Sequence, residues 1–206
     1  MPKAKALVIV AHADDETLWM GATLRRLRNK YDWTICCVPQ SEGTEAGKIF
    51  KRVCKEIYDA KPILLNCRSL KKSEVIRKLN KFNYDLIFTH NAIGETGHPT
   101  HIKVHNIIKA MDFDRLVTFW PYNDRRNYLA DVLINLTDAE RKFKFEVLTQ
   151  YPSFLKTPKD ALIALLKHMK TEGFLIPKDK QESAIYKFYI TSFQNYAKDK
   201  LRNAVI

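Results

Sequence analysis

The sequence predicts an α/β protein with a three-layer, Rossmann-like fold, in which a mostly parallel sheet is covered by helices on both faces. Short apolar segments alternate with segments of helical period along residues 5–111, and this alternation is typical of βαβ units. Polar motifs follow the first and fourth apolar segments, at the strand ends where open α/β sheets bind their ligands.

The predicted elements follow one another in a regular order. A β-branched run at 5–11 predicts a buried parallel strand, and apolar residues at helical spacing predict a helix at 14–30. Thr137 and Glu140 form a capping-box pattern at the start of a later helix. The other predicted strands are 33–38, 63–66, 85–90, 116–120 and 131–136, and the other predicted helices are 46–60, 72–82, 99–111 and 137–149.

The chain shows no internal repeat and no linker, so we expect a single domain over 1–206. Its motif-bearing core covers about 5–155, and a lysine-rich, helical C-terminal region follows at about 156–206. Helices are expected there near 158–170 and 181–200. The four cysteines include no C-x-x-C pair, which indicates reduced packing residues rather than a thiolate metal site.

The net charge of +12 arises from 35 basic and 23 acidic side chains. Such an excess attracts polyanions of any kind, but the basic residues are scattered along the chain, which favours a solvated surface. No apolar run approaches the roughly 18 residues of a membrane helix, and the first apolar run is too short for a signal peptide. The sequence therefore predicts a cytoplasmic protein without a membrane span.

The first chemical motif is Ala11-His12-Ala13-Asp14-Asp15-Glu16, which joins the first strand to the first helix. His12 lies in the connection and Asp15 in the first helical turn, so both side chains can turn towards one point above the sheet. Imidazole and carboxylate are both zinc ligands. The alternative is an acidic first turn that only stabilises the helix N-terminus, with His12 incidental.

The second motif is Gly94-Glu95-Thr96-Gly97-His98-Pro99-Thr100-His101, which opens the helix after the fourth strand. His98 and His101 are three residues apart, and His101 can reach the same crevice as the first motif. Two ligands close in sequence and a third far away are common in catalytic zinc sites. His105 is expected to be a buried histidine that donates to a backbone carbonyl, and the same role would explain His98 or His101 taken alone.

Together the two motifs resemble the signatures of the LmbE-like, or PIG-L, family of zinc-dependent N-acetylglucosaminyl deacetylases. The family's A-H-P-D-D-E signature matches residues 11–16, and its H-P-D-H signature matches residues 98–101. The resemblance covers roughly residues 5–155, and both signatures stand in the expected order. It implies a zinc-dependent hydrolase that removes an N-acetyl group from an N-acetylglucosamine-type sugar or sugar conjugate, an anionic one included, and releases acetate.

The resemblance also implies roles for particular residues. His12, Asp15 and His101 are the implied zinc ligands, a set that Fe²⁺ or Co²⁺ could also occupy. Asp14 is the implied general base for the attacking water. His98, when protonated, would stabilise the oxyanion and donate to the leaving amine.

This chain departs from the family pattern at a few positions. Ala13 replaces a proline, and Thr100 replaces the aspartate that supports the catalytic histidine, here His98. Since Thr100 is neutral, His98 is expected to be protonated over a narrower pH range, unless Glu95 or Asp124 supplies the missing charge. Two weaker assignments complete the substrate-binding residues, namely Arg52 and Glu95.

Two other functions are compatible with the sequence. One is an amidase that acts on another sugar conjugate. The other is a catalytically inactive basic module that binds phosphorylated ligands or nucleic acid, although the tyrosines form no nucleic-acid module with the basic residues. The sequence leaves the acceptor sugar open, and the oligomeric state as well, a homo-oligomer included.

Overall fold

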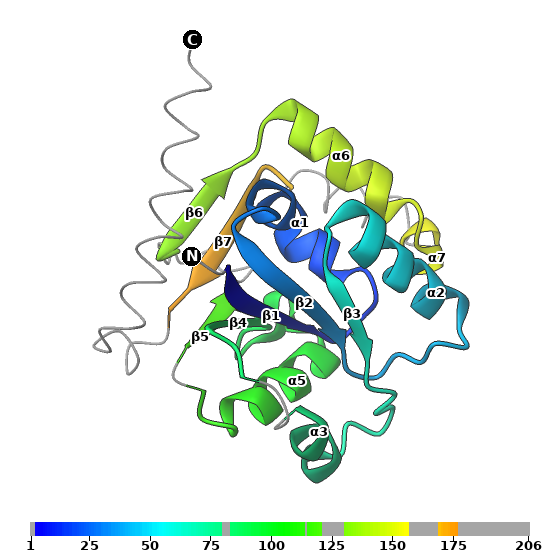
Figure 1. Cartoon of the computed structure of the whole chain (residues 1–206), viewed down its shortest axis with the longest axis vertical. Coiled ribbons are helices and arrows are strands. Elements are labelled where there is room, and N and C mark those ends of the chain that lie inside the picture. The colour runs from blue at the N-terminus through cyan, green and yellow to red at the C-terminus, as the bar shows by residue number, and fades with distance from the viewer. Residues whose placement is uncertain (1–2, 80–82, 114, 121–129, 157–168, 177–206) are drawn as a thin grey trace.

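The computed structural model in Figure 1 describes residues 3–79, 83–113, 115–120, 130–156 and 169–176. It confirms an α/β fold around a seven-stranded sheet with the strand order β3-β2-β1-β4-β5-β7-β6. The strands are β1 (Ala4–Val10), β2 (Tyr31–Cys37), β3 (Lys61–Leu64), β4 (Leu86–Thr89), β5 (Leu116–Phe119), β6 (Val132–Asn135) and β7 (Thr171–Leu175). The helices are α1 (Asp15–Leu27), α2 (Glu45–Arg52), α3 (Lys72–Leu79), α4 (Gly94–Gly97), α5 (Pro99–Lys109), α6 (Asp138–Leu148) and α7 (Pro152–Leu155), with a π-helical turn η1 (Val53–Ile57) after α2.

The parallel part of the sheet is built around β1, which pairs with β2 on one side and β4 on the other. Alternate residues of β1 pack on opposite faces: Val8 and Val10 belong to one apolar core cluster, and Leu7 and Ile9 to the other. In Figure 1, α1, α2 and α6 lie on one side of the sheet and α3 and α5 on the other. This arrangement confirms the predicted covering of both faces.

The carboxyl ends of the neighbouring central strands β1 and β4 lie side by side. Ile9 of β1 is paired with Thr89 of β4, so the segments that follow the two strands leave the sheet together. These segments carry the first and second chemical motifs. The parallel pairing therefore brings together residues that lie about 80 positions apart in the chain.

Strand β7 was not predicted, and it changes one side of the sheet. It pairs antiparallel with β5 and with β6, so that β6 lies at the edge. Its sequence, Thr-Glu-Gly-Phe-Leu, does not predict a strand, because glutamate and glycine are uncommon in strands. A Cβ on Gly173 would lie 2.7 Å from the Cβ of Trp120, so this close approach requires glycine. The predicted helices at 158–170 and 181–200 fall almost entirely outside the described residues.

Helix α1 is broken, whereas the sequence predicted a continuous helix. Met20 has the non-helical angles φ −148° and ψ 23°. The backbone N–H groups of Ala22 and Thr23, which start the second half of the helix, donate to the Glu172 carboxylate at 2.9 and 2.8 Å. A carboxylate on β7 therefore caps a helix N-terminus that begins in the middle of α1.

Lys144 of α6 also binds at the break in α1. Its Nζ donates to the backbone carbonyl of Leu18 at 2.9 Å and to Glu172 Oε1 at 2.7 Å. The side chains of Lys144 and Glu172 are each only 1% exposed. This buried ion pair provides hydrogen-bond partners for the free backbone groups on both sides of the break, and it links α1 to α6 and β7.

Substituting Lys144 by methionine should destabilise the protein by about 3–5 kcal/mol, because it leaves the Glu172 carboxylate buried without its cation. Chemical denaturation followed by circular dichroism would measure the change. The matched control on the same helix is Lys142→Met, since that side chain is 79% exposed. The control should change stability by less than about 0.5 kcal/mol. An equal effect of both variants would show that the buried pair contributes nothing beyond a surface charge.

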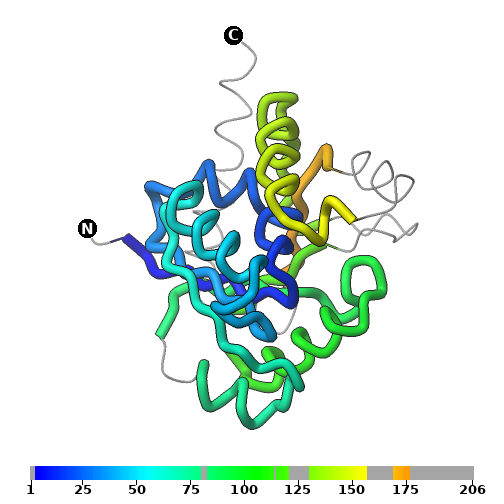
Figure 2. The backbone as a smooth tube through the Cα atoms, turned by 90° about the vertical axis from the view of Figure 1, so that its right-hand side faces the viewer, coloured from blue at the N-terminus to red at the C-terminus, as the bar shows by residue number. Residues whose placement is uncertain are grey.

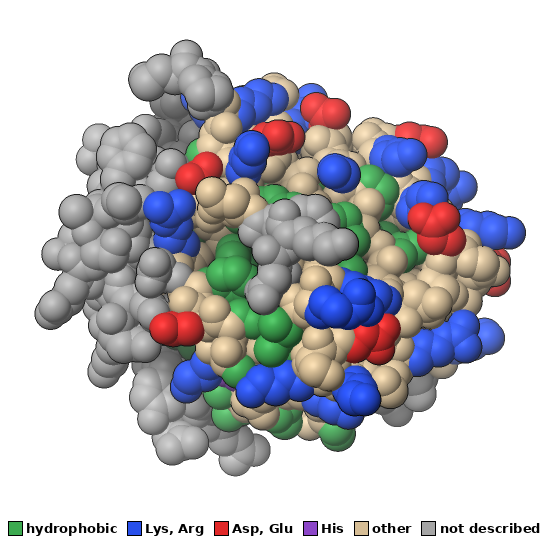
Figure 3. Space-filling model, turned by 60° about the horizontal axis from the view of Figure 1, so that its bottom comes forward, with side chains coloured by type: hydrophobic (Ala, Val, Ile, Leu, Met, Phe, Trp, Pro, Cys, Tyr) green, Lys and Arg blue, Asp and Glu red, His purple; other side chains and the backbone are tan. Residues whose placement is uncertain are grey.

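The charged surface agrees with the scattered distribution seen in the sequence. On the face drawn in Figure 3, Lys and Arg side chains alternate with acidic, apolar and other polar groups. On this face the positive charge is therefore spread out rather than gathered in one continuous basic groove. Among the described residues, no helix combines the length and the apolar character that a membrane crossing requires.

Candidate metal centre

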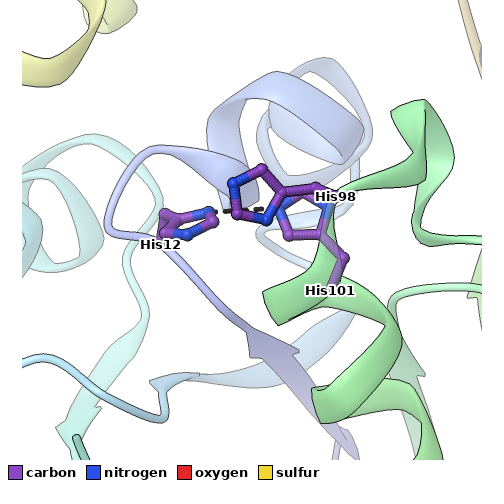
Figure 4. Close-up of side chains that lie close together, drawn as sticks. All are labelled: His12, His98 and His101. Carbon is purple, nitrogen blue, oxygen red and sulfur yellow. Dashed lines mark hydrogen bonds between the residues drawn. The ribbon is translucent and has the colours of Figure 1, made fainter.

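The two chemical motifs meet at the end of the sheet formed by the carboxyl ends of β1 and β4. His12 follows β1, and His98 and His101 lie at the start of α5; Figure 4 shows the three rings turned towards one another. Figure 2 shows this end of the sheet, with the start of α1 beside α7 and with α4 and α5 opposite. The fold thus gathers both predicted motifs at one place.

Three side chains from these motifs converge on a single point. The Nδ1 of His12 lies 3.0 Å from the Nε2 of His101 and 3.3 Å from Asp15 Oδ2. The Nε2 of His101 lies 3.4 Å from the same carboxylate oxygen. Asp15 and His101 are buried, whereas His12 is half-buried and faces the surface. The three atoms therefore form a small triangle that is open on one side.

The size of this triangle suits a tetrahedral metal ion. Ligand atoms bound to zinc at about 2.0–2.1 Å in a tetrahedron lie about 3.3 Å apart. The carboxylate oxygen and at least one imidazole lone pair converge here, and only a proton or a cation can lie between such groups. The donor set of His12, Asp15 and His101 thus fits zinc, Fe²⁺ or Co²⁺ by its chemistry.

Within the described part of the chain, two other groups of three donors lie close enough to hold an ion: His12 with His98 and His101, and Asp15 with His90 and His101. The second group is less suited, because the Nε2 of His90 already accepts the backbone N–H of Ala11 at 2.9 Å. A lone pair used in this way cannot also bind a metal. The metal content of His98→Ala distinguishes the first group from the predicted set, because His98 belongs only to the first group.

Asp15 is held by donors on both of its oxygens. The backbone N–H of His12 donates to Oδ2 at 2.7 Å, and the indole N–H of Trp19 donates to Oδ1 at 3.2 Å. Burial acts to raise its pKa, but the imidazoles of His101, His12 and His90 together hold the pKa of Asp15 well below its usual range. Asp15 is therefore an ionised, fixed carboxylate.

Asp14 stands beside the triangle, at the N-terminus of α1. Its Oδ2 accepts a hydrogen bond from the Ser153 hydroxyl of α7 at 2.6 Å. Burial and the negative charge of Asp15 raise the pKa of Asp14 above its usual value. A carboxylate with a raised pKa is a better proton acceptor, as a general base requires.

His98 lies at the exposed rim of the cluster, with its ring centre 4.7 Å from that of His12 and 4.8 Å from that of His101. Its Nδ1 accepts the backbone N–H of Thr100 at 3.2 Å, so it caps α5. Burial and the neighbouring His12 and His101 lower the pKa of His98. In the neutral ring, Nδ1 is an acceptor and Nε2 carries the proton. The geometry thus favours a neutral His98, where the family resemblance implied a protonated one.

Glu95 lies inside the protein, although a substrate contact was predicted for it. It is 1% exposed, and its Oε2 accepts hydrogen bonds from the Nδ1 of His101 at 2.6 Å and from the Nδ1 of His90 at 2.8 Å. Its Oε1 accepts the backbone N–H of Asn91 at 2.7 Å. Both oxygens are therefore occupied by protein donors. Burial would raise the pKa of Glu95, but these imidazole donors lower it.

Arg52, the other predicted substrate contact, ends α2 and is exposed. Its guanidinium donates to Gln150 Oε1 at 3.0 Å, just before α7. The structure therefore places Arg52 in a surface pair between α2 and α7, rather than against the histidines. His105 is confirmed as a buried histidine whose Nδ1 donates to a backbone carbonyl, that of His90, at 2.7 Å.

Other residues around the centre were missed by the sequence analysis. His90 is the first residue after β4, and His12 is the second residue after β1; this position at the end of a strand was the available signal for His90. Behind the centre, Glu16 accepts from the hydroxyls of Thr17 at 2.8 Å and Tyr151 at 2.9 Å. Burial raises the pKa of Glu16 to about 8. Glu16 therefore belongs to the interior that supports the start of α1.

Comparisons with known proteins show the family of this chain. The sequence profile of the GlcNAc-PI de-N-acetylase (PIG-L) family matches residues 7–111, which are 105 of the 206 residues. An uncharacterized protein of Acanthamoeba polyphaga mimivirus is 26% identical over 143 residues, which make up 57% of this chain. The match spans only 62% of that relative, less than two thirds of its length.

Solved structures share the fold at low sequence identity. The N,N'-diacetylchitobiose deacetylase of Pyrococcus horikoshii superimposes with a TM-score of 0.64 at 16% identity, over 84% of each chain. The 4-carboxy-2-hydroxymuconate hydratase GalB of Pseudomonas putida gives 0.51 at 11% identity, over 88% of this chain and all of that one. Since both a deacetylase and a hydratase share the fold, the fold alone does not decide the reaction. The matched profile covers both motifs, and this chain belongs to the PIG-L family of GlcNAc-PI de-N-acetylases.

Proposed function

We propose that this protein is a metal-dependent amide hydrolase that removes the acetyl group from an N-acetylglucosamine-type sugar or sugar conjugate. The proposal is supported above all by the triangle of His12, Asp15 and His101, whose donor atoms are 3.0–3.4 Å apart. The adjacent Asp14 supplies the base that such a hydrolysis needs. The positive net charge favours substrates that carry phosphate or another anionic group.

The metal would be held by His12, Asp15 and His101. Bound there, a zinc ion would supply Lewis acidity that polarises the acetyl carbonyl and promotes ionisation of a water molecule. The carboxylate of Asp15 is fixed by Trp19 and by the backbone of His12, so the donor set is held in place before any ion arrives.

Asp14 would take a proton from the attacking water. The hydroxyl of Ser153 donates to Oδ2 and orients the carboxylate, which leaves Oδ1 for the water. As the C–N bond of the amide breaks, the leaving amine needs a proton, and Asp14 is placed to return the one it received. Acetate and the free amino sugar would be the products.

His98 would stabilise the carbonyl oxygen as it becomes negatively charged. Because its Nδ1 accepts the N–H of Thr100, the neutral ring carries its proton on Nε2. An Nε2–H group at the rim of the site is a hydrogen-bond donor for an oxyanion. In this chain the histidine would thus act as a neutral donor, in keeping with the missing aspartate at Thr100.

Substituting His98 by alanine should lower kcat by about 10²- to 10³-fold, the usual cost of removing one oxyanion donor, without loss of metal. Steady-state kinetics and metal analysis by mass spectrometry would measure both effects. His98→Gln keeps an N–H donor and should recover part of the rate. Loss of the metal in His98→Ala would instead indicate that His12, His98 and His101 form the ligand set.

The function itself is tested with the purified full chain. Zinc-loaded and chelator-treated protein would be incubated with N-acetylglucosamine, N,N'-diacetylchitobiose and phosphate-bearing N-acetylglucosamine conjugates, and released acetate would be measured. Acetate release by the zinc-loaded form alone supports the proposal. Release of a longer acyl group from another conjugate would favour the amidase alternative. Salt-sensitive binding of nucleic acid without any hydrolysis would favour the inactive binding module.

A further inference from the structure

We infer that Glu95, together with His90, is a positioning unit that fixes the His101 ring in the tautomer whose Nε2 faces the candidate metal centre. The inference deepens the proposed function, on which its metal-binding part rests. Its basis is a continuous set of contacts from Ala11 through His90 and Glu95 to His101.

The tautomers follow from the acceptor at the centre of this unit. An ionised carboxylate can only accept hydrogen bonds, and Glu95 Oε2 contacts the Nδ1 atoms of both His90 and His101. Each of these nitrogens must therefore carry a hydrogen. A neutral imidazole has only one N–H, so the Nε2 atom of each ring is left with a lone pair.

The two lone pairs have different partners. That of His90 accepts the backbone N–H of Ala11 at 2.9 Å, so it is already used. That of His101 faces His12 Nδ1 at 3.0 Å and Asp15 Oδ2 at 3.4 Å. Glu95 therefore prepares His101, and not His90, as a metal ligand.

Packing holds the two rings in this relation. His90 and His101 are stacked, with ring centres 3.9 Å apart and an interplanar angle of 25°. His90 also packs against Phe119 in a T-shaped arrangement with ring centres 5.5 Å apart, and the His90 side chain is fully buried. A buried, stacked pair cannot turn freely, so the orientation of His101 is set before a metal binds.

Glu95 itself reaches this position through an unusual backbone. Its φ is +52° and its ψ is −59°, a positive-φ conformation that residues other than glycine rarely adopt. Such strain persists only where the surroundings enforce it, and it is concentrated at functional sites. Here three hydrogen bonds to its carboxylate hold the residue in place.

These contacts also bear on Thr100, which stands where the family has an aspartate that supports the catalytic histidine. The carboxylate of Glu95 contacts His101 and His90 rather than His98, and Asp124, the other carboxylate considered for His98, lies outside the described residues. His98 is left to accept the backbone N–H of Thr100. The second motif of this chain therefore supports the metal ligand and leaves the rim histidine neutral.

The first measurement uses metal-free protein with ¹⁵N-labelled histidine. Long-range ¹H–¹⁵N spectra distinguish a protonated ring nitrogen from one with a lone pair, and His101→Ala and His90→Phe assign the signals. Both rings should show their hydrogen on Nδ1. A hydrogen on the Nε2 of His101 in the wild-type protein would overturn the inference, whatever any variant does.

The second measurement compares Glu95→Gln with the exposed control Glu146→Gln. In Glu95→Gln one carboxylate oxygen becomes an NH2 group, which faces either the backbone N–H of Asn91 or the two ring Nδ1 atoms. In molecules of the second kind the hydrogen of His101 should move to Nε2, because an NH2 group cannot accept the Nδ1–H. Zinc affinity, measured by competition with a chromophoric chelator, should fall about 10- to 100-fold in Glu95→Gln and stay unchanged in Glu146→Gln. An unchanged affinity and tautomer in a folded Glu95→Gln protein would contradict the inference. Failure of the wild-type protein to bind zinc or release acetate would contradict the proposed function instead, and the tautomer measurement would still be readable.

Discussion

Substituting Asp14 by asparagine is expected to lower kcat by about 10²- to 10⁴-fold while metal binding stays intact. An amide cannot take the proton of the attacking water, because it has no basic oxygen. Its side-chain oxygen still accepts the hydrogen bond from Ser153, so the local structure should be kept. Single-turnover kinetics of acetate release, with metal analysis of the same sample, would measure the two properties together.

The control for Asp14→Asn is Asp32→Asn, which removes an exposed carboxylate from β2. It should leave turnover and metal content as they are. The decisive comparison is with Asp15→Asn. If Asp14→Asn lost the metal and Asp15→Asn kept it, the roles of base and ligand would have to be exchanged.

Loss of the metal is the second large effect, expected for His12→Ala, Asp15→Ala and His101→Ala. Purified wild-type protein should carry about one divalent ion per chain, since three protein ligands and an open position form the usual catalytic zinc site. Each substitution removes one donor from the triangle and leaves two, so bound metal and turnover should both fall to background. Inductively coupled plasma mass spectrometry after extensive dialysis would measure the metal.

The choice between ligand sets rests on the same variants. His98→Ala should keep its ion if His12, Asp15 and His101 are the ligands. Full occupancy in His101→Ala would contradict every one of the three donor groups, because His101 belongs to all of them. Thermal unfolding of each metal-free variant would separate the loss of a ligand from a loss of the fold.

The sequence by itself determined the fold class and both chemical motifs. A β-branched run followed by turn residues located β1, and the Thr137–Glu140 capping box that begins α6 is confirmed. These features depend on neighbours within a few positions, so local patterns predict them. Because parallel strands end at a common edge, the sequence also predicted that His12 and His101 would meet, and their nitrogens are 3.0 Å apart.

Contacts between distant segments were decided only by the tertiary structure. Helix α1 breaks at Met20 because Glu172 of β7 and Lys144 of α6 satisfy the freed backbone groups, about 150 and 120 positions along the chain. The position of His90 after β4 places it near the site, but no local pattern shows that His90 and Glu95 would contact His101; stacking and burial bring these side chains together. A side chain's partners in the folded interior set its protonation and its orientation, and no local pattern of residues specifies those partners.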